Sequence, residues 1–260
     1  MLELSTLVAG ATGEAGLAVL LTLARLSGLL LVVSPIGAAL PGTLRVALCL
    51  VLAVCLARTP VPGAEHLLAD PWRLAGAAVS EFGLGAVLSL GINIGFAVFT
   101  TAGRLLDIQI GFGMGQVLDP VTRQQMPVLT GIFRQLALVA FFSGTAFASF
   151  LIGFARGLDL IPVGQAWLPG AAVAAAVTAF GGMFSLGFAM AAPVVVVLML
   201  IEFALGVIAR NLPQMNMFAL GIPLKVVAGT AALALWIGSA DALVARAFQL
   251  GFDVWSGVLH

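Results

Sequence analysis

The sequence predicts an all-α membrane protein, and its composition is the first observation that supports this fold class. Hydrophobic residues make up 62% of the 260 residues, and the mean hydropathy is +1.18. Only 8% of the residues are charged, against roughly 25% in an ordinary soluble domain. A soluble fold needs more polar residues than this to cover its surface. The composition therefore excludes a soluble enzyme domain, a disordered chain and a basic nucleic-acid binder, since 11 basic and 11 acidic residues also balance.

The second observation is a series of apolar runs, which predicts about six helical segments, several of them bent. The runs are Ala15–Val33, Val46–Ala57, Leu74–Ala102, Met126–Ala155, Gly170–Ala209 and Met217–Ile237. A helix that crosses the hydrocarbon core needs about 20 residues. Val46–Ala57 is too short for this, and Gly170–Ala209 is long enough for two helices. Pro193 is the natural break or kink in the longer run, because proline removes a backbone donor and clashes with the preceding turn.

Polar stretches rich in proline and glycine predict the turns between these segments. They are Ser34–Thr43, Arg58–Arg73, Gly103–Gln125, Arg156–Trp167 and Arg210–Asn216. We expect residues 1–260 to form a single integral domain. The first run lacks a basic flank and a cleavage site, so we expect it to remain in the mature protein. The tail from about residue 239 to 260 fits a short interfacial helix or a frayed terminus equally well.

Several charged residues fall inside apolar runs, where each costs about 2.5–3.5 kcal/mol at a helix centre. Among them are Arg25, Glu81, Arg134 and Glu202. We expect these side chains to avoid uncompensated contact with lipid. Three interpretations remain: internal ion pairs that hold the fold, a proton or solute path, and contacts with other subunits or a channel lining.

Small residues recur at helical spacing and predict close packing of helix backbones. Glu81, Gly85, Ser89 and Asn93 step by four and form a strip of small and polar groups. Gly91 and Gly95 form a GxxxG pair within the same run.

The most unusual stretch is Asp107–Gln116, in which three glycines alternate with Phe112 and Met114. A phosphate-binding loop does not fit, because no Lys-Ser or Lys-Thr follows and the segment does not join a strand to a helix. A flexible turn is one interpretation. The other is a pliable apolar constriction, in which the glycines let the backbone move and Phe112 and Met114 exclude water.

The sequence contains no catalytic constellation and no spacing typical of metal ligands. We therefore predict no catalytic residue, no cofactor and no metal site, and the chain is not expected to be an enzyme.

Several segments together resemble a known family. The most specific is Arg210–Phe218 (RNLPQMNMF), which is followed by Gly221–Leu224 (GIPL). Weaker segments occur in the matching order: Arg25–Gly28 with Pro35 and Pro41 behind it, Glu81–Gly85, Ala102–Gly111, Asp119-Pro120 with Met126–Leu129, and Ala192-Pro193. From about residue 15 to 240, the set resembles the FliR family, subunits of the flagellar type III export gate.

This resemblance implies an assembly of bent helical hairpins rather than an isolated bundle. Family members join the FliP and FliQ gate subunits in a helical export gate, with FlhB attached. The gate lies in the bacterial inner membrane, at the core of the flagellar basal body, and passes unfolded flagellar proteins out of the cytoplasm. The implied partners also include proximal rod components and membrane lipid, but no nucleic acid.

The resemblance also implies roles for particular residues. The loop from Asp107 to about Pro120 matches the plug that helps to close the gate; relatives are often less glycine-rich at Gly113 and Gly115. The implied gate or plug residues are Ile108, Ile110, Gly111, Phe112, Gly113, Met114 and Gly115. The residues expected to act through buried charge or in assembly are Arg25, Glu81, Arg134, Glu202, Arg210, Pro213, Gln214 and Asn216.

Three other functions remain open from the sequence. The first is the homologous gate subunit of virulence injectisomes, which gene neighbourhood would distinguish. The second is a proton-coupled transporter of small solutes that uses Glu81, Arg134 and Glu202. The third is a purely structural membrane scaffold. Neutralising Glu81 separates the transporter from the gate subunit, since a transporter would lose coupled uptake and a gate subunit would lose motility and secretion.

Overall fold

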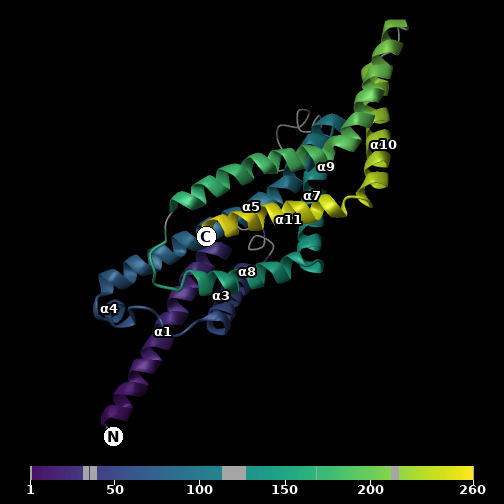
Figure 1. Cartoon of the computed structure of the whole chain (residues 1–260). Helices are drawn as coiled ribbons and strands as arrows, with labels where there is room; N and C mark the ends of the chain where they lie inside the picture. The colour runs from purple at the N-terminus through teal and green to yellow at the C-terminus, as the bar shows by residue number, and fades with distance from the viewer. Residues whose placement is uncertain are drawn as a thin grey trace. The chain divides into compact units, whose positions relative to one another are not determined.

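The computed structural model describes residues 2–31, 35, 40–112, 127–167, 169–211 and 217–259. Within these ranges the chain is almost entirely helical and contains no strand (Figure 1). The helices are α1 (Leu2–Leu31), α3 (Gly42–Leu56), α4 (Ala64–Ala69), α5 (Pro71–Ile110), α7 (Val128–Ser143), α8 (Ala146–Leu160), α9 (Pro169–Asn211), α10 (Met217–Ile237) and α11 (Asp241–Leu259). The predicted all-α, membrane-type fold class is confirmed.

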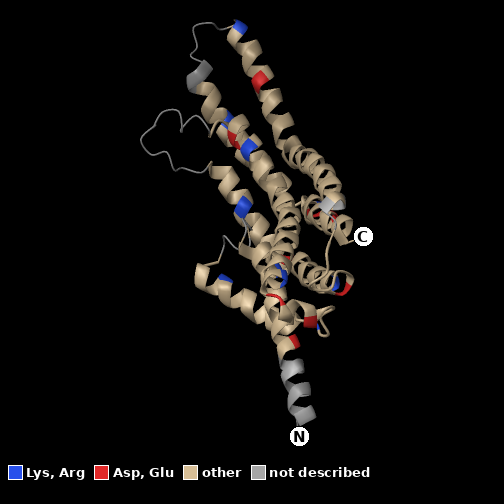
Figure 2. Ribbon diagram, turned by 90° about the vertical axis from the view of Figure 1, so that its left-hand side faces the viewer, with Lys and Arg blue, Asp and Glu red and all other residues tan. Residues whose placement is uncertain are grey.

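Four helices among the described residues are long and apolar enough to cross a membrane. These segments are Gly13–Leu31 in α1, α5, Ala172–Asn211 in α9 and Leu220–Ile237 in α10. The bent pair α7 and α8 adds a fifth if it counts as one span, and α3 is a shorter apolar helix. Figure 2 shows how few charged residues interrupt these helices. In order along the chain, these elements match the six apolar runs of the sequence.

Helix α5 extends further in both directions than its apolar run. It begins at Pro71, where the fixed φ of proline suits the first helical position. The side chain of Asp70 accepts a hydrogen bond from the Trp72 amide at 2.9 Å and caps this end. The helix ends at Ile110, and Gly111 follows with a φ of +100°, a conformation that glycine adopts without strain. The turn expected from Gly103 onward therefore starts eight positions later, and α4 also lies inside the expected turn Arg58–Arg73.

Helix α9 continues through Pro193, where the sequence suggested a break or a kink, so the break is excluded. Helix α10 likewise contains Pro223. A proline removes one backbone hydrogen bond, but apolar membrane helices tolerate this loss when the neighbouring turns adjust. The run Gly170–Ala209 therefore forms one long helix rather than two.

The chain divides into two compact units. Unit 1 comprises Met1–Ile94, Gly144–Ala179 and Leu250–His260, and unit 2 comprises Gly95–Ser143 and Phe180–Gln249. Helices α5, α9 and α11 each contribute residues to both units.

An aromatic cluster and a tryptophan hydrogen bond lie at the core of unit 1. Trp255 of α11 is buried, and its ring centroid lies 5.6 Å from that of Phe150 and 5.7 Å from that of Phe252. Its indole N–H donates to the Leu88 carbonyl of α5 at 2.8 Å. A buried indole N–H needs such a partner, so this bond fixes α11 against α5.

The core of unit 2 is a group of phenylalanines whose ring centroids lie 5.5 or 5.6 Å apart. Its members are Phe96, Phe99, Phe141 and Phe248. The outer helices are covered far less. Only 17% of the apolar window of α9 and 11% of that of α10 is buried, against 61% for α5. Large side chains such as Phe203, Val227 and Leu235 therefore face outward.

The C-terminal tail forms helix α11, whose apolar face packs into the fold. Ala247 and Val254 are fully buried. The GxxxG pair of α5 contacts this helix: a Cβ on Gly91 would lie 2.5 Å from the Gly251 carbonyl oxygen in unit 1. In unit 2, a Cβ on Gly95 would lie 3.1 Å from the Ala247 carbonyl oxygen. The predicted close approach of backbones at this pair is confirmed.

Candidate functional site

A buried ion pair joins α1 to α5 in unit 1. The Nε of Arg25 donates to Oε2 of Glu81 at 2.6 Å, and the two side chains are 1% and 2% exposed. For these two residues, the structure selects the internal ion pair from the three interpretations that the sequence left open.

The remaining polar atoms of this pair bind the end of α8 and the segment that follows it. Nη1 and Nη2 of Arg25 donate to the carbonyls of Gly157 and Ile161 at 3.3 and 2.9 Å. Oε1 of Glu81 accepts a hydrogen bond from the Gly164 amide at 2.8 Å. The Gly157 carbonyl also accepts a hydrogen bond from the Ile161 amide at 3.0 Å. A cation placed at this end of a helix is stabilised by the helix dipole. One ion pair thus connects three parts of unit 1.

Two glycines allow the helices that carry this pair to come into backbone contact. A Cβ on Gly28 of α1 would lie 2.1 Å from the Phe82 carbonyl oxygen. A Cβ on Gly85 of α5 would lie 1.9 Å from the Arg25 carbonyl oxygen. Real Cβ contacts are never this short, so any side chain at either position must push α1 and α5 apart. The close approach of α1 and α5 at these two glycines sets the distance between Arg25 and Glu81.

A second buried carboxylate, Asp107 of α5, holds the start of α7 in unit 2. Its Oδ1 accepts a hydrogen bond from the Leu129 amide, and its Oδ2 accepts one from the Thr130 amide, both at 2.9 Å. The Thr130 hydroxyl donates to Oδ2 at 2.8 Å. The first amides of a helix lack partners within it, so Asp107 caps α7 from a different helix. Gly103 makes room, since a Cβ there would lie 2.7 Å from the Thr130 Cα.

Asp107 therefore fixes both ends of the glycine-rich connection, by which we mean residues 111–127 between α5 and α7. It lies one turn before the end of α5, where its own carbonyl accepts a hydrogen bond from the Gly111 amide at 3.2 Å. Its side chain holds the first turn of α7, the helix that follows the connection. Sequence reasoning did not assign this role, because the capped amides lie 22 and 23 positions further along the chain.

Asp107→Ala is expected to destabilise the start of α7. Two buried amides and one hydroxyl lose their acceptor, at a cost of about 1–3 kcal/mol for each buried donor left unsatisfied. Hydrogen–deuterium exchange of the Leu129 and Thr130 amides measures this, and we expect faster exchange at both. Asp253→Ala, at an exposed position of α11, is the matched control and should leave these amides protected. Unchanged exchange in Asp107→Ala would rule out the capping role.

The residues expected to form the plug differ in how far they are buried. Ile110 is fully buried in α5 and lies against α10, where a Cβ on Gly229 would come within 2.6 Å of its Cγ1. Ile108 is 73% exposed on the same helix. Gly111 and Phe112 form the turn that follows, and Phe112 is half-buried. Gly113, Met114 and Gly115 lie outside the described residues.

The other predicted charges do not gather with Arg25 and Glu81. Glu202 of α9 forms an ion pair with Lys225 of α10, and both groups are partly exposed. Sequence reasoning missed Lys225, although it also lies inside an apolar run, Met217–Ile237. That signal marks a charge that needs compensation, but it does not indicate a partner 23 positions away. Arg134 is half-buried on α7, and Arg210 is exposed near the end of α9; neither forms an ion pair within the described part of the chain. Pro213, Gln214 and Asn216 lie outside the described residues.

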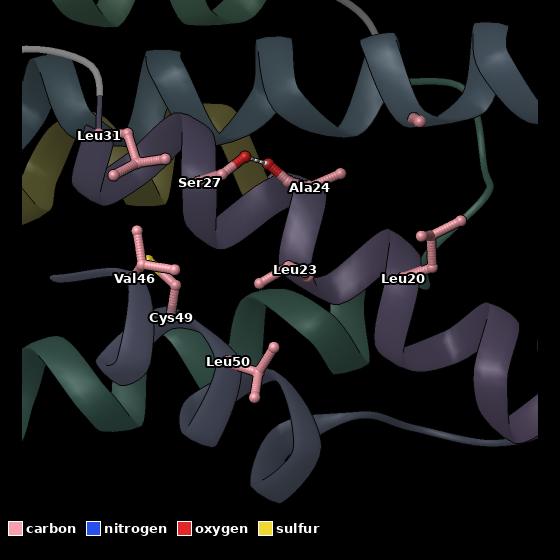
Figure 3. Close-up of a pocket in the computed structure, with 9 residues that line it drawn as sticks. Leu20, Leu23, Ala24, Ser27, Leu31, Val46, Cys49 and Leu50 are labelled. Carbon is pink, nitrogen blue, oxygen red and sulfur yellow. Dashed lines mark hydrogen bonds between the residues drawn. The ribbon is translucent and has the colours of Figure 1, made fainter. Parts of the chain in front are cut away.

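An apolar cavity of about 350 Å³ lies in unit 1 between α1 and α3 (Figure 3). Leu20, Leu23, Val46 and Leu50 line it, and the hydroxyl of Ser27 is already bound to the Ala24 carbonyl at 2.7 Å. The cavity therefore offers hydrocarbon contact and no free polar group. Among the described residues, no group of three or more His, Cys, Asp or Glu side chains could hold a metal ion. The polar groups of the two buried clusters are engaged in structural bonds, which suits assembly rather than bond-making chemistry.

Comparison with known families gives a match to "Bacterial export proteins, family 1" over residues 17–251. The chain belongs to this family. The match includes unit 2, most of unit 1 and the residues of both buried carboxylate clusters. It is to a family of export proteins and not to an enzyme family, as the sequence predicted.

Curated members of the family that resemble the chain come from flagellar and from other export systems. The chain is 31% identical to the flagellar biosynthetic protein FliR of Bacillus subtilis (strain 168) over 185 residues, which is 70% of this chain and 71% of that protein. It is 29% identical to FliR of Escherichia coli (strain K12), over 60% of each chain. It is 26% identical to the Yop proteins translocation protein T of Yersinia pestis, over 74% of this chain and 75% of that protein. The resemblance to the FliR family is thereby confirmed.

Proposed function

We propose that this protein is a subunit of the flagellar type III export gate in the bacterial inner membrane. It would join the FliP and FliQ subunits, with FlhB and proximal rod components as neighbours, and pass unfolded flagellar proteins out of the cytoplasm. The observation that carries the proposal is the family match across residues 17–251, together with relatives named as flagellar FliR proteins.

The surface of α9 and α10 supports a role within an assembly. These helices expose large apolar side chains, yet the ion pair of Glu202 and Lys225 lies between them. Apolar side chains at this density need lipid or protein around them, and partly exposed charges are costly against bare lipid. Neighbouring subunits supply both an apolar surface and polar partners for such a pair.

Co-purification tests the assignment to the flagellar gate. A tagged chain produced from its own chromosomal locus should retain FliP and FliQ after extraction in mild detergent, and deletion of its gene should abolish both motility and export of flagellar filament protein. Recovery of injectisome subunits instead, with normal motility after deletion, would assign the chain to a virulence secretion system. The similarity to the Yop translocation protein T makes this the second candidate.

We also propose that the glycine-rich connection acts as a plug. Ile110, the last residue of α5 before this connection, is buried against α10. Asp107 belongs to the last part of α5 and binds the start of α7, so it holds the helices on both sides of the connection. Phe112 and Met114 supply the apolar bulk that would exclude water and ions from a closed gate.

Deletion of Gly111–Gly115 is expected to make the closed gate leaky to ions. Planar-bilayer conductance of the purified assembly, or growth under osmotic stress, measures the leak. Replacing Phe112 and Met114 with serine keeps the length of the connection and tests the apolar bulk by itself. Unchanged conductance in both variants would contradict the plug role, while a leak in the deletion alone would assign closure to length rather than to these two side chains.

A further inference from the structure

We propose that the groove between α8 and α11 binds an anionic phospholipid, with its phosphate at Arg156 and an acyl chain along the groove floor. The groove is a cavity of about 510 Å³ within unit 1. One face of each helix lines it: Ser149, Ile152, Gly153, Arg156 and Leu160 from α8, and Phe252, Trp255, Ser256 and Leu259 from α11.

The positive charge in the groove comes from Arg156, which lies one turn before the end of α8. No acidic side chain lines the groove among the described residues. The nearest acidic residue along α8, Asp159, already pairs with Arg58 at 3.3 Å. Arg156 forms no ion pair with a described residue, so its guanidinium is free to bind a phosphate, whose oxygens match the geometry of its donors.

The floor of the groove is apolar and fixed in place. Gly153 lets the ring of Trp255 lie close to α8, since a Cβ there would be 3.2 Å from the ring. The indole N–H is bound to the Leu88 carbonyl and is not available to a ligand. The Ser256 hydroxyl is also occupied, because it donates to the Asp253 carbonyl at 2.8 Å. A polar solute gains little from such a floor, whereas a hydrocarbon chain gains by burial of its apolar surface.

The position of the groove along α8 favours lipid as the occupant. The Arg58–Asp159 pair lies near the C-terminal end of α8, and its side chains are 57% and 60% exposed. Exposed charges are costly against lipid, so we assign this end of α8 to water. From Arg156 the groove runs along the helix, past Leu160 at one end and towards Ile152 and Ser149 at the other. Arg156 thus lies between the exposed Arg58–Asp159 pair and the aromatic and aliphatic side chains of the groove. This arrangement is expected at the boundary between lipid head groups and hydrocarbon. This inference is independent of the proposed export function.

Photocrosslinking in intact membranes tests the proposal on the full chain with its natural partners. Ile152 is replaced by p-benzoylphenylalanine in cells whose membranes contain phosphatidylglycerol and phosphatidylethanolamine, and the crosslinked peptide is identified by mass spectrometry. Val139, exposed on α7 and outside the groove, gives the reference ratio of the two lipids. We expect the ratio of anionic to zwitterionic adducts at Ile152 to exceed this reference about fivefold, the effect of one cation near a head group.

Two charge variants decide whether Arg156 causes the preference. Arg156→Gln should reduce the ratio at Ile152 to the reference value, and Arg58→Gln, at an exposed cation near the same helix end, should leave it raised. Leu160 serves as a second crosslinking position in case the probe at Ile152 disturbs the groove. A protein adduct, a ratio equal to the reference, a ratio unaffected by Arg156→Gln, or no lipid adduct at either groove position would overturn the proposal.

Discussion

Glu81→Ala is expected to lower the free energy of unfolding by about 3–5 kcal/mol, because it leaves the guanidinium of Arg25 buried without its counter-ion. The Gly164 amide also loses its acceptor. Thermal unfolding in detergent, followed by far-ultraviolet circular dichroism, measures the loss for the chain by itself. Retention of partner subunits on purification measures its effect on assembly.

Two further variants show what the buried pair contributes. Asp159→Ala breaks the exposed pair with Arg58 and should cost about 0–1 kcal/mol. The double variant Arg25→Met/Glu81→Leu removes both charges and should recover most of the stability lost in Glu81→Ala, because hydrophobic replacements of a buried pair are often neutral. If Glu81→Ala unfolds no earlier than Asp159→Ala, the pair is not structurally important. If the double variant is as unstable as the single one, the bonds to α8 matter more than charge balance.

Gly85→Ala is expected to disrupt the contact between α1 and α5. Its new Cβ would lie 1.9 Å from the Arg25 carbonyl oxygen, and a backbone atom cannot move aside as a flexible side chain can. We therefore expect a cost at the upper end of the range for overpacking, about 1–3 kcal/mol or more. Arg25 carries that carbonyl, so separation of the helices also strains its pair with Glu81.

Gly76→Ala is the matched control for this variant, because it lies on the same helix with nothing within 4 Å of the new Cβ. Alanine is the better helix former, and this change should stabilise the chain by up to about 1 kcal/mol. Comparison of the two melting temperatures separates helix propensity from packing. Equal effects of the two substitutions would show that the close approach at Gly85 does not exist in the protein.

The helical runs could be read from the sequence because membrane helices carry their signal locally. Each apolar run from Ala15–Val33 to Met217–Ile237 has a counterpart in the structure, since hydropathy acts residue by residue. Helix ends were harder to predict. Helix α5 continues past Gly103 to Ile110, and α9 continues past Pro193, because a helix end depends on which neighbours satisfy its backbone groups.

The candidate site was only partly predictable for the same reason. The sequence identified Arg25 and Glu81 as charges that require compensation, but it did not show that they compensate each other. Their separation of 56 positions carries no periodic signal. The roles of Asp107 and Lys225 were missed, because the groups that they bind lie more than 20 positions away.

The sequence by itself determined that this protein is helical and apolar, that its charges are too few for a soluble surface, and that its motifs are those of an export family. Hydropathy, glycine spacing and short motifs are properties of neighbouring residues, so they need no fold to be read. Only the tertiary structure decided which charge meets which, and that the carboxylate of Asp107 caps the start of a distant helix. Such contacts depend on where separate helices come together. The residue type of a carboxylate does not show whether its partner in the fold is a guanidinium, an amide or water.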